Sequence, residues 1–190
     1  LGFALLLWLA GRGGTWAAPA AGEPAFGCIT GQVRVGSAQS AGGQIPALCQ
    51  PYRLTIELCS TTIPACADPP CIVEVNADAY GRFTLCDLAV GTHTLVVRGF
   101  NTLANVRTAQ AVPEGTAAAP VDFGTLAAGD ASGNNRVDGL DYSILATAYR
   151  TSSGGPGWDR RADFNCDGTI SGLDYSTLAT NYRMAGASCP

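Results

Sequence analysis

The hydrophobic pattern divides the chain into an N-terminal part with short alternating stretches and a C-terminal part with helical periodicity. Between residues 28 and 128, seven short stretches of apolar and alternating residues are bounded by Gly, Pro, Asn and Asp, which is typical of β-strands. They cover residues 29–35, 52–59, 72–75, 83–85, 93–97, 106–112 and 121–126. About seven strands in about one hundred residues predict a mainly β domain with a sandwich fold.

The C-terminal part contains two near-copies of one pattern. Residues 137–150 read VDGLDYSILATAYR and residues 170–183 read ISGLDYSTLATNYR, which are identical at ten of fourteen positions. In each copy Leu, Ala and Tyr recur at three- and four-residue spacing, so we expect helices over residues 141–149 and 174–182. The sequence therefore predicts a small α-helical domain built from two repeats.

A loop rich in oxygen-bearing side chains leads into each repeat. Residues 163–174 read DFNCDGTISGLD, with side-chain oxygens at loop positions 1, 3, 5, 9 and 12 and Gly168 at position 6, where the loop must turn sharply. Residues 130–141 follow the same spacing, with Asn135 in place of the glycine. Asparagine tolerates the left-handed backbone conformation that this turn requires. Calcium needs six to eight oxygen ligands, so the two loops predict two calcium ions.

The predicted ligands follow from the loop positions. In the second loop the side-chain ligands are Asp163, Asn165, Asp167 and Asp174, the backbone carbonyl comes from Thr169, and Ser171 acts through a water. In the first loop the corresponding residues are Asp130, Ser132, Asn134 and Asp141, with the carbonyl of Arg136 and a water-mediated contact from Asp138. The first loop has fewer carboxylates among its early ligands, so we expect it to be the weaker site.

The duplicated unit resembles a type I dockerin, the calcium-dependent docking module of cellulosomes and related surface assemblies. The resemblance covers residues 129–184, and the loops close with Asp141 and Asp174 instead of the long Glu of EF-hands. It implies docking onto a cohesin-like receptor, with loop positions 10 and 11 helping to select the partner. These positions are Gly139 with Leu140 and Gly172 with Leu173, which departs from the hydroxyl pair common in cellulosomal examples. The alternative is that calcium only holds a small domain together.

The N-terminal domain carries a weaker resemblance. Residues 78–99 predict a turn, a strand, a second turn at Gly91 and another strand. This segment resembles the core hairpin of carboxypeptidase-regulatory-like and collagen-adhesin B-type sandwiches, which have transthyretin-like folds. Such domains are usually stalks, spacers or adhesion modules. We expect His93 to face solvent from its strand.

The N-terminal residues suggest export. The apolar run LGFALLLWLAG is too short to span a bilayer, and small residues follow it near Ala20, which is the pattern of a secretory signal peptide. A retained segment that joins subunits is the alternative. We assign residues 1–26 to a leader and linker, 27–128 to the sandwich and 129–190 to the dockerin-like domain. The predicted location is secreted, either extracellular or at the cell surface.

Eight cysteines behind an export signal indicate disulfide bonds formed in an oxidising compartment. The candidates are Cys28, Cys49, Cys59, Cys66, Cys71, Cys86, Cys166 and Cys189. We expect a bridge between Cys166 and Cys189, and a loop closed by Cys66 and Cys71; the first six cysteines alone allow fifteen pairings. Zinc is the competing interpretation, which the single histidine and the lack of a CxxC pair disfavour.

The charge and the residue composition argue against two classes of function. A formal net charge of −4 without a basic stripe argues against nucleic-acid binding. One histidine and no G-x-S-x-G motif argue against a hydrolytic enzyme. We therefore predict a non-enzymatic calcium-binding structural protein that assembles non-covalently, either with other subunits into a surface layer or filament or onto a cohesin-like partner. The alternative is carbohydrate binding or cell-surface adhesion, in which Tyr52 and Tyr80 of the sandwich contact a polysaccharide.

Overall fold

The structure is a computed structural model that describes residues 25–36, 43–59, 71–116 and 120–190. The predicted leader and Cys66, which the predicted loop closure with Cys71 requires, lie outside these ranges. Within these ranges, no helix is long and apolar enough to cross a membrane.

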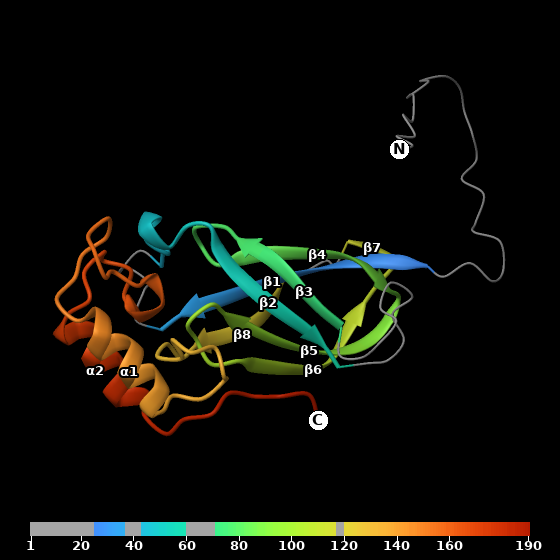
Figure 1. Cartoon of the computed structure of the whole chain (residues 1–190). Helices are drawn as coiled ribbons and strands as arrows, with labels where there is room; N and C mark the ends of the chain where they lie inside the picture. Colours follow the sequence, from blue (N-terminus) through green and yellow to red (C-terminus); the bar gives the residue numbers. More distant parts are fainter. Residues whose placement is uncertain (1–24, 37–42, 60–70, 117–119) are drawn as a thin grey trace, which may run out of the picture.

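Two β-sheets form the N-terminal part of the molecule (Figure 1). In the first sheet, β1 (Phe26–Val35) pairs antiparallel with β4 (Arg82–Ala89) and parallel with β7 (Gly115–Thr116) and β8 (Val121–Leu126). The second sheet is antiparallel in the order β3 (Cys71–Ala77), β2 (Tyr52–Leu58), β5 (Gly91–Gly99) and β6 (Asn105–Val112). The predicted sandwich is therefore confirmed, with β7 as an additional strand too short for a periodicity signal.

Alternating residues fill the space between the sheets. On β1 the side chains of Ile29, Val33 and Val35 are buried, and on β2 those of Leu54 and Ile56 are buried, whereas the residues between them are more exposed. This is the period-two pattern of a strand with one face on a core. The apolar alternation that predicted these strands therefore also defines the core.

The C-terminal part contains helices α1 (Gly139–Ala148) and α2 (Gly172–Asn181), which lie side by side at one end of the sandwich (Figure 1). Two single turns of 3-10 helix, η1 (Ala47–Cys49) and η2 (Arg160–Ala162), are the other helical elements of the residues that the structure describes. Both α-helices begin two residues before the predicted positions, because Asp138 and Ser171 act as N-caps in capping boxes. Apolar periodicity marks where a helix packs, whereas the capping residue decides where it begins.

The two repeats are interlocked. The backbone N–H of Arg150, after α1, donates to the carbonyl of Ile170 in the second loop over 2.9 Å. The equivalent N–H of Arg183, after α2, donates to Val137 in the first loop over 2.8 Å. Each loop is thus tied to the segment that leaves the other helix, so the repeats form one unit and not two independent ones.

Apolar residues of both repeats build a second core, which includes one residue of the sandwich. Val137, Leu145, Phe164 and Leu178 are buried together, and Leu103 from the β5–β6 connection packs among them. The N–H of Leu103 also donates to the carbonyl of Ala127 over 2.8 Å. The β5–β6 connection is therefore part of the C-terminal core as well as of the sandwich.

Three disulfide bonds have both of their cysteines among the described residues. Cys28–Cys86 joins β1 to β4, whereas Cys49–Cys166 and Cys59–Cys189 join the sandwich to the C-terminal part. The predicted Cys166–Cys189 bridge is therefore wrong.

The course of the C-terminal segment gives the physical reason. After α2 the chain runs back along the sandwich (Figure 1), where the N–H of Ala187 donates to the carbonyl of Ala104 over 2.9 Å. This places Cys189 beside Cys59 at the end of β2, while Cys166 faces Cys49 at the other end of the sandwich.

Two other sequence expectations are corrected by burial. His93 is only 3% exposed, with its Nε2 atom 2.8 Å from the carbonyl oxygen of Ala89, because it lies on the same inward face of β5 as the buried Leu95 and Val97. Tyr52 is fully buried with its ring 5.5 Å from that of Phe100. Burial raises the pKa of the Tyr52 phenol strongly, and a sugar cannot stack on this ring. Tyr80 remains exposed.

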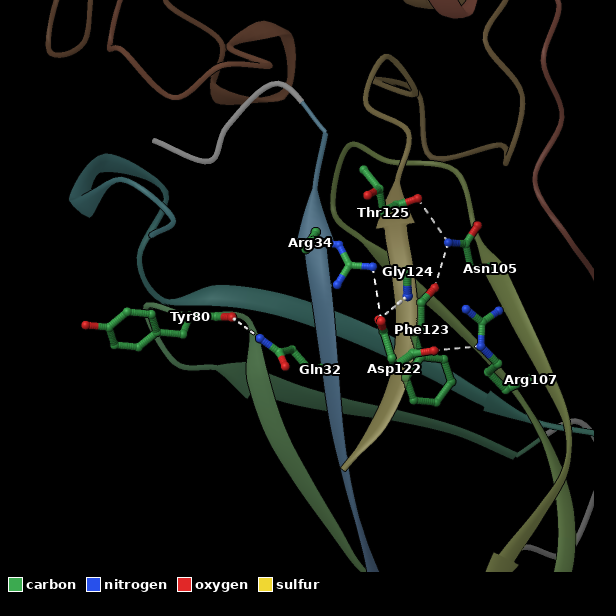
Figure 2. A network of polar contacts seen from close by, with 9 residues as sticks. All are labelled: Gln32, Arg34, Tyr80, Asn105, Arg107, Asp122, Phe123, Gly124 and Thr125. Carbon is green, nitrogen blue, oxygen red and sulfur yellow. Dashed lines mark hydrogen bonds and ion pairs between the residues drawn. The ribbon is translucent and has the colours of Figure 1, made fainter. Parts of the chain in front are cut away.

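One side of the sandwich is closed by side chains that bridge its two sheets (Figure 2). The amide of Asn105, on β6, donates to the carbonyls of Phe123 and Thr125 on β8 over 2.8 and 3.0 Å. Arg107 Nε donates to the carbonyl of Asp122 over 2.7 Å. These bonds satisfy carbonyls at a strand edge that would otherwise offer a template for pairing with another chain.

We expect Asn105→Ala to lower the free energy of unfolding by about 1 kcal/mol, because two carbonyls of β8 lose their donor and the bond to Phe123 is partly buried. Urea denaturation followed by circular dichroism measures this change. The control is Gln110→Ala on the same strand, whose amide donates to the nearby Thr108 carbonyl, with an expected change below about 0.5 kcal/mol. Equal changes in the two variants would contradict a role for Asn105 in joining the sheets.

Candidate metal centres and docking face

The second loop turns two buried carboxylates into its interior. Asp163, at position 1, is 2% exposed, and its Oδ2 accepts the N–H of Gly168 over 3.0 Å. Its Oδ1 is buried and has no hydrogen-bond partner among the described residues. Asp174, at position 12, is also buried and accepts the N–H groups of Phe164 and Ser171 over 2.8 and 2.9 Å. Positions 1 and 12 are therefore fixed by backbone amides of the loop that they close.

The tip of the second loop is more exposed. Asp167, the predicted ligand at position 5, accepts the N–H of Thr169 and an amide hydrogen of Asn165, each over 2.8 Å. Asn165 is the predicted ligand at position 3, so these polar side chains lie together at the tip. Thr169, whose backbone carbonyl is a predicted calcium ligand, pairs with Ser152 in an isolated β-bridge.

The first loop has the same layout. Asp130 accepts the N–H groups of Gly133, Asn134 and Asn135 over 2.8, 3.0 and 2.8 Å, so both of its oxygens are in use. Asp141 accepts the N–H groups of Ser132 and Asp138 over 2.8 and 2.7 Å.

The predicted ligands of the first loop are also brought together. The hydroxyl of Ser132 donates to Asp130 over 3.3 Å, and the amide of Asn134 donates to Asp138 over 3.2 Å. Arg136, whose backbone carbonyl is a predicted calcium ligand, pairs with Ala185 in an isolated β-bridge. Asn135 has a φ angle of 63°, which confirms that asparagine replaces glycine at the turn.

Burial makes these carboxylates costly to ionise. It raises the pKa of Asp130, Asp163 and Asp174, while backbone N–H groups act in the opposite direction. Asp141 raises the pKa of Asp130 further, and Asp174 raises that of Asp163. Like charges held together away from water are stabilised by a nearby cation, and without one the carboxyls bind protons more readily.

The donor chemistry fits calcium. Within the described ranges, no three His, Cys, Asp or Glu side chains gather around one point, so an ion would also need amide, hydroxyl and carbonyl oxygens. Calcium accepts such mixed oxygen ligands, whereas zinc favours His and Cys. The unpartnered Asp163 Oδ1 is the atom that most directly calls for a cation.

The predicted docking residues occupy the first turns of the two helices. Gly139 and Leu140 begin α1, and Gly172 and Leu173 begin α2. Leu140 is 60% exposed and Leu173 is 63% exposed. The caps connect them to the loops, because Asp138 accepts the N–H of Leu140 and Ser171 accepts that of Leu173.

Two exposed tyrosines between the helices were not among the predicted site residues. Tyr142 and Tyr175 meet edge to face with ring centroids 6.5 Å apart. Grooves of about 330 and 360 Å³ flank this pair, one lined also by Tyr149 and the other by Tyr182. The four tyrosines occupy matching positions of the two repeats, so the repeated pattern could have identified them as candidate surface residues.

The surroundings of the two predicted docking positions differ. A groove of about 560 Å³ lies between α2 and the sandwich, with Leu173 and Thr177 on one wall and Thr125 and Ala127 on the other. The internal symmetry of the repeats is thus broken by the sandwich.

Comparison with known proteins agrees with this geometry. The family model of the dockerin type I domain matches residues 128–181. No curated protein sequence matches the chain. Two crystal structures of type II cohesin–X–dockerin complexes from Acetivibrio cellulolyticus, an N-terminal and a C-terminal interface mutant, are similar in fold, each with a TM-score of 0.59 and 23% identity. Each match covers 84% of this chain and 97% of the other. Residues 128–181 are therefore a type I dockerin-like module, attached to a β-sandwich.

Proposed function

We propose that this chain is a non-enzymatic extracellular protein whose dockerin-like module binds a cohesin-like protein and depends on calcium to do so. The observation that carries the proposal is the repeated combination of a loop with buried carboxylates and a helix that begins with an exposed leucine. Two matched copies in one interlocked unit are an arrangement suited to presenting a partner surface.

Calcium would be held by the predicted ligands of both loops. In the second loop these include Asp163, Asn165 and Asp174, and in the first they include Asp130, Ser132 and Asp141. The ion supplies the positive charge that the buried carboxylates need. Because Asp174 and Asp141 also bind the N–H groups of the N-cap residues, ordering a loop also orders the first turn of its helix.

The disulfides support an extracellular location. Bonds such as Cys49–Cys166 form and persist in oxidising compartments, and the apolar leader predicted from the sequence agrees with export. A non-catalytic role is supported by the match of residues 128–181 to the dockerin type I domain, which is a docking module and not a catalytic one.

The sandwich affects how a partner can approach. A protein that covers Leu173 would also meet Thr125 and Ala127 across the groove, whereas Leu140, in the first turn of α1, does not line this groove. The near-identity of the repeats suits binding in two orientations, and the sandwich makes the two orientations unequal.

We expect the purified chain to bind an immobilised cohesin in millimolar calcium and to lose this binding in EDTA, as measured by surface plasmon resonance. The probes are a panel of type I and type II cohesin modules. Leu140→Asp combined with Leu173→Asp should abolish binding while leaving the calcium titration unchanged, because these side chains lie outside the predicted ligand sets.

Binding that survives EDTA would contradict the calcium dependence. Filaments or large oligomers of the chain alone, seen by electron microscopy in calcium, would favour self-assembly over a cohesin-like partner. If the chain bound no cohesin of the panel and remained a monomer in calcium, the proposed docking would be overturned. Calcium would then have only a stabilising role.

We expect Asp163→Ala with Asp174→Ala to weaken total calcium binding more than Asp130→Ala with Asp141→Ala. Asp163 retains a free, buried oxygen, whereas both oxygens of Asp130 already accept backbone N–H groups. Isothermal titration calorimetry of the two double variants measures the difference, and equal losses would disprove the ranking.

A further inference from the structure

We infer that the β-sandwich holds both calcium loops in their ion-binding shape by contacting the same three positions of each loop. These are positions 1, 4 and 6, which are Asp130, Gly133 and Asn135 in the first loop and Asp163, Cys166 and Gly168 in the second. The inference rests on the proposed calcium binding and adds a role for residues far from the loops in the sequence.

Position 1 of both loops is contacted by one residue of the sandwich. Asn101 lies in the β5–β6 connection and is 1% exposed. Its carbonyl accepts the N–H of Asp130 over 3.2 Å, and its side-chain amide donates to the carbonyl of Asp163 over 3.5 Å. The first residues of the two loops are therefore anchored to a single buried point.

Position 4 is held from strand β5 in the first loop and from the 3-10 turn η1 in the second. Arg98, near the end of β5, donates from Nη1 to the carbonyl of Gly133 over 2.8 Å. The equivalent residue of the second loop, Cys166, is bonded covalently to Cys49 of η1. Arg160, next to the second loop, adds a hydrogen bond of 2.7 Å to the carbonyl of Cys49.

Position 6 is held as well. The side-chain oxygen of Asn135 accepts the N–H of Ala104 from the sandwich over 2.9 Å. Gly168 packs so closely on Leu48 of η1 that a Cβ at this position would lie 2.8 Å from Leu48 Cδ1. A larger residue at position 168 would therefore displace the Leu48 side chain, and it would also strain the backbone, because Gly168 has a φ angle of 83°.

Positions 4 and 6 are also where the backbone of each loop is left-handed. The φ angles are 75° at Gly133 and 63° at Asn135, and 59° at Cys166 and 83° at Gly168. This conformation is unfavourable for residues with a Cβ, such as Asn135 and Cys166. The sandwich thus contacts each loop where its shape is hardest to maintain, which general packing between two domains would not require.

The consequence is preorganisation. A loop already held in its binding shape loses less conformational entropy when an ion binds, so its affinity is higher. The second loop is held covalently and should keep its shape without calcium. The first loop is held by hydrogen bonds and should depend more on the ion.

The test compares variants of the full chain by calcium titration, with the amide resonances of Gly133 and Gly168 reporting on each loop. Cys49→Ser with Cys166→Ser should weaken calcium binding at the second loop about tenfold and leave the first loop nearly unchanged. Arg98→Ala should weaken binding at the first loop by a comparable factor and spare the second. Arg98→Ala alters one exposed contact and keeps all disulfides, so it tests the inference even if the cysteine variant misfolds.

Two controls separate this effect from general loss of stability. Cys28→Ser with Cys86→Ser removes a disulfide inside the sandwich, and Arg53→Ala removes an exposed ion pair with Glu74. Both should bind calcium like the original chain. If the Cys28 and Cys86 variant loses as much affinity as the Cys49 and Cys166 variant, the inference is overturned.

Hydrogen exchange in EDTA gives a readout that does not involve calcium. The amide of Gly168, which is bonded to Asp163, should stay protected in the original chain and exchange faster in the Cys49 and Cys166 variant. Unchanged exchange together with unchanged affinity would overturn the inference. If the original chain bound no calcium at all, the proposed function would fail, and the exchange comparison alone would still decide whether the sandwich holds the loop.

Discussion

The burial of a carboxylate at each end of each loop is the constraint on which the module depends. Asp163 and Asp174 bind backbone amides of their own loop, and one of these amides belongs to the N-cap residue of α2. Loop shape, helix start and the position of Leu173 are therefore set by the same few hydrogen bonds. The same groups create a need for positive charge, because burial opposes their ionisation. Structure and ion requirement thus have a common origin.

The sandwich and the dockerin-like module are joined more closely than a linker would allow. Leu103 of the sandwich is buried in the second core, Arg160 of the module lies 4.7 Å from the ring of Phe100 of the sandwich, and two disulfides cross between the parts. Interfaces between domains of one chain are usually polar and mobile. Here covalent bonds and shared apolar burial favour a single body.

Local patterns in the sequence predicted the local structure, and long-range partners were beyond them. Periodicity located the strands and helices, and ligand spacing located both loops, including the left-handed turn at Asn135. The partner of Cys166 lies 117 residues away and that of Cys189 lies 130 residues away, and nothing near either cysteine encodes that choice. His93 and Tyr52 were misjudged because burial depends on what packs above a strand, and alternation shows only which face a residue occupies.

The Cys59–Cys189 bond also determines how the molecule bears mechanical load. Tension applied to the chain on either side of these two cysteines passes from one to the other through the disulfide. The segment of chain between the two cysteines, which are 130 residues apart in sequence, contains both helices and both loops. This segment does not carry the force, because the disulfide is the shorter covalent path. Stretching the polypeptide from outside this covalent ring therefore cannot unravel the helices, and a load reaches them only through whatever protein is bound to their surface.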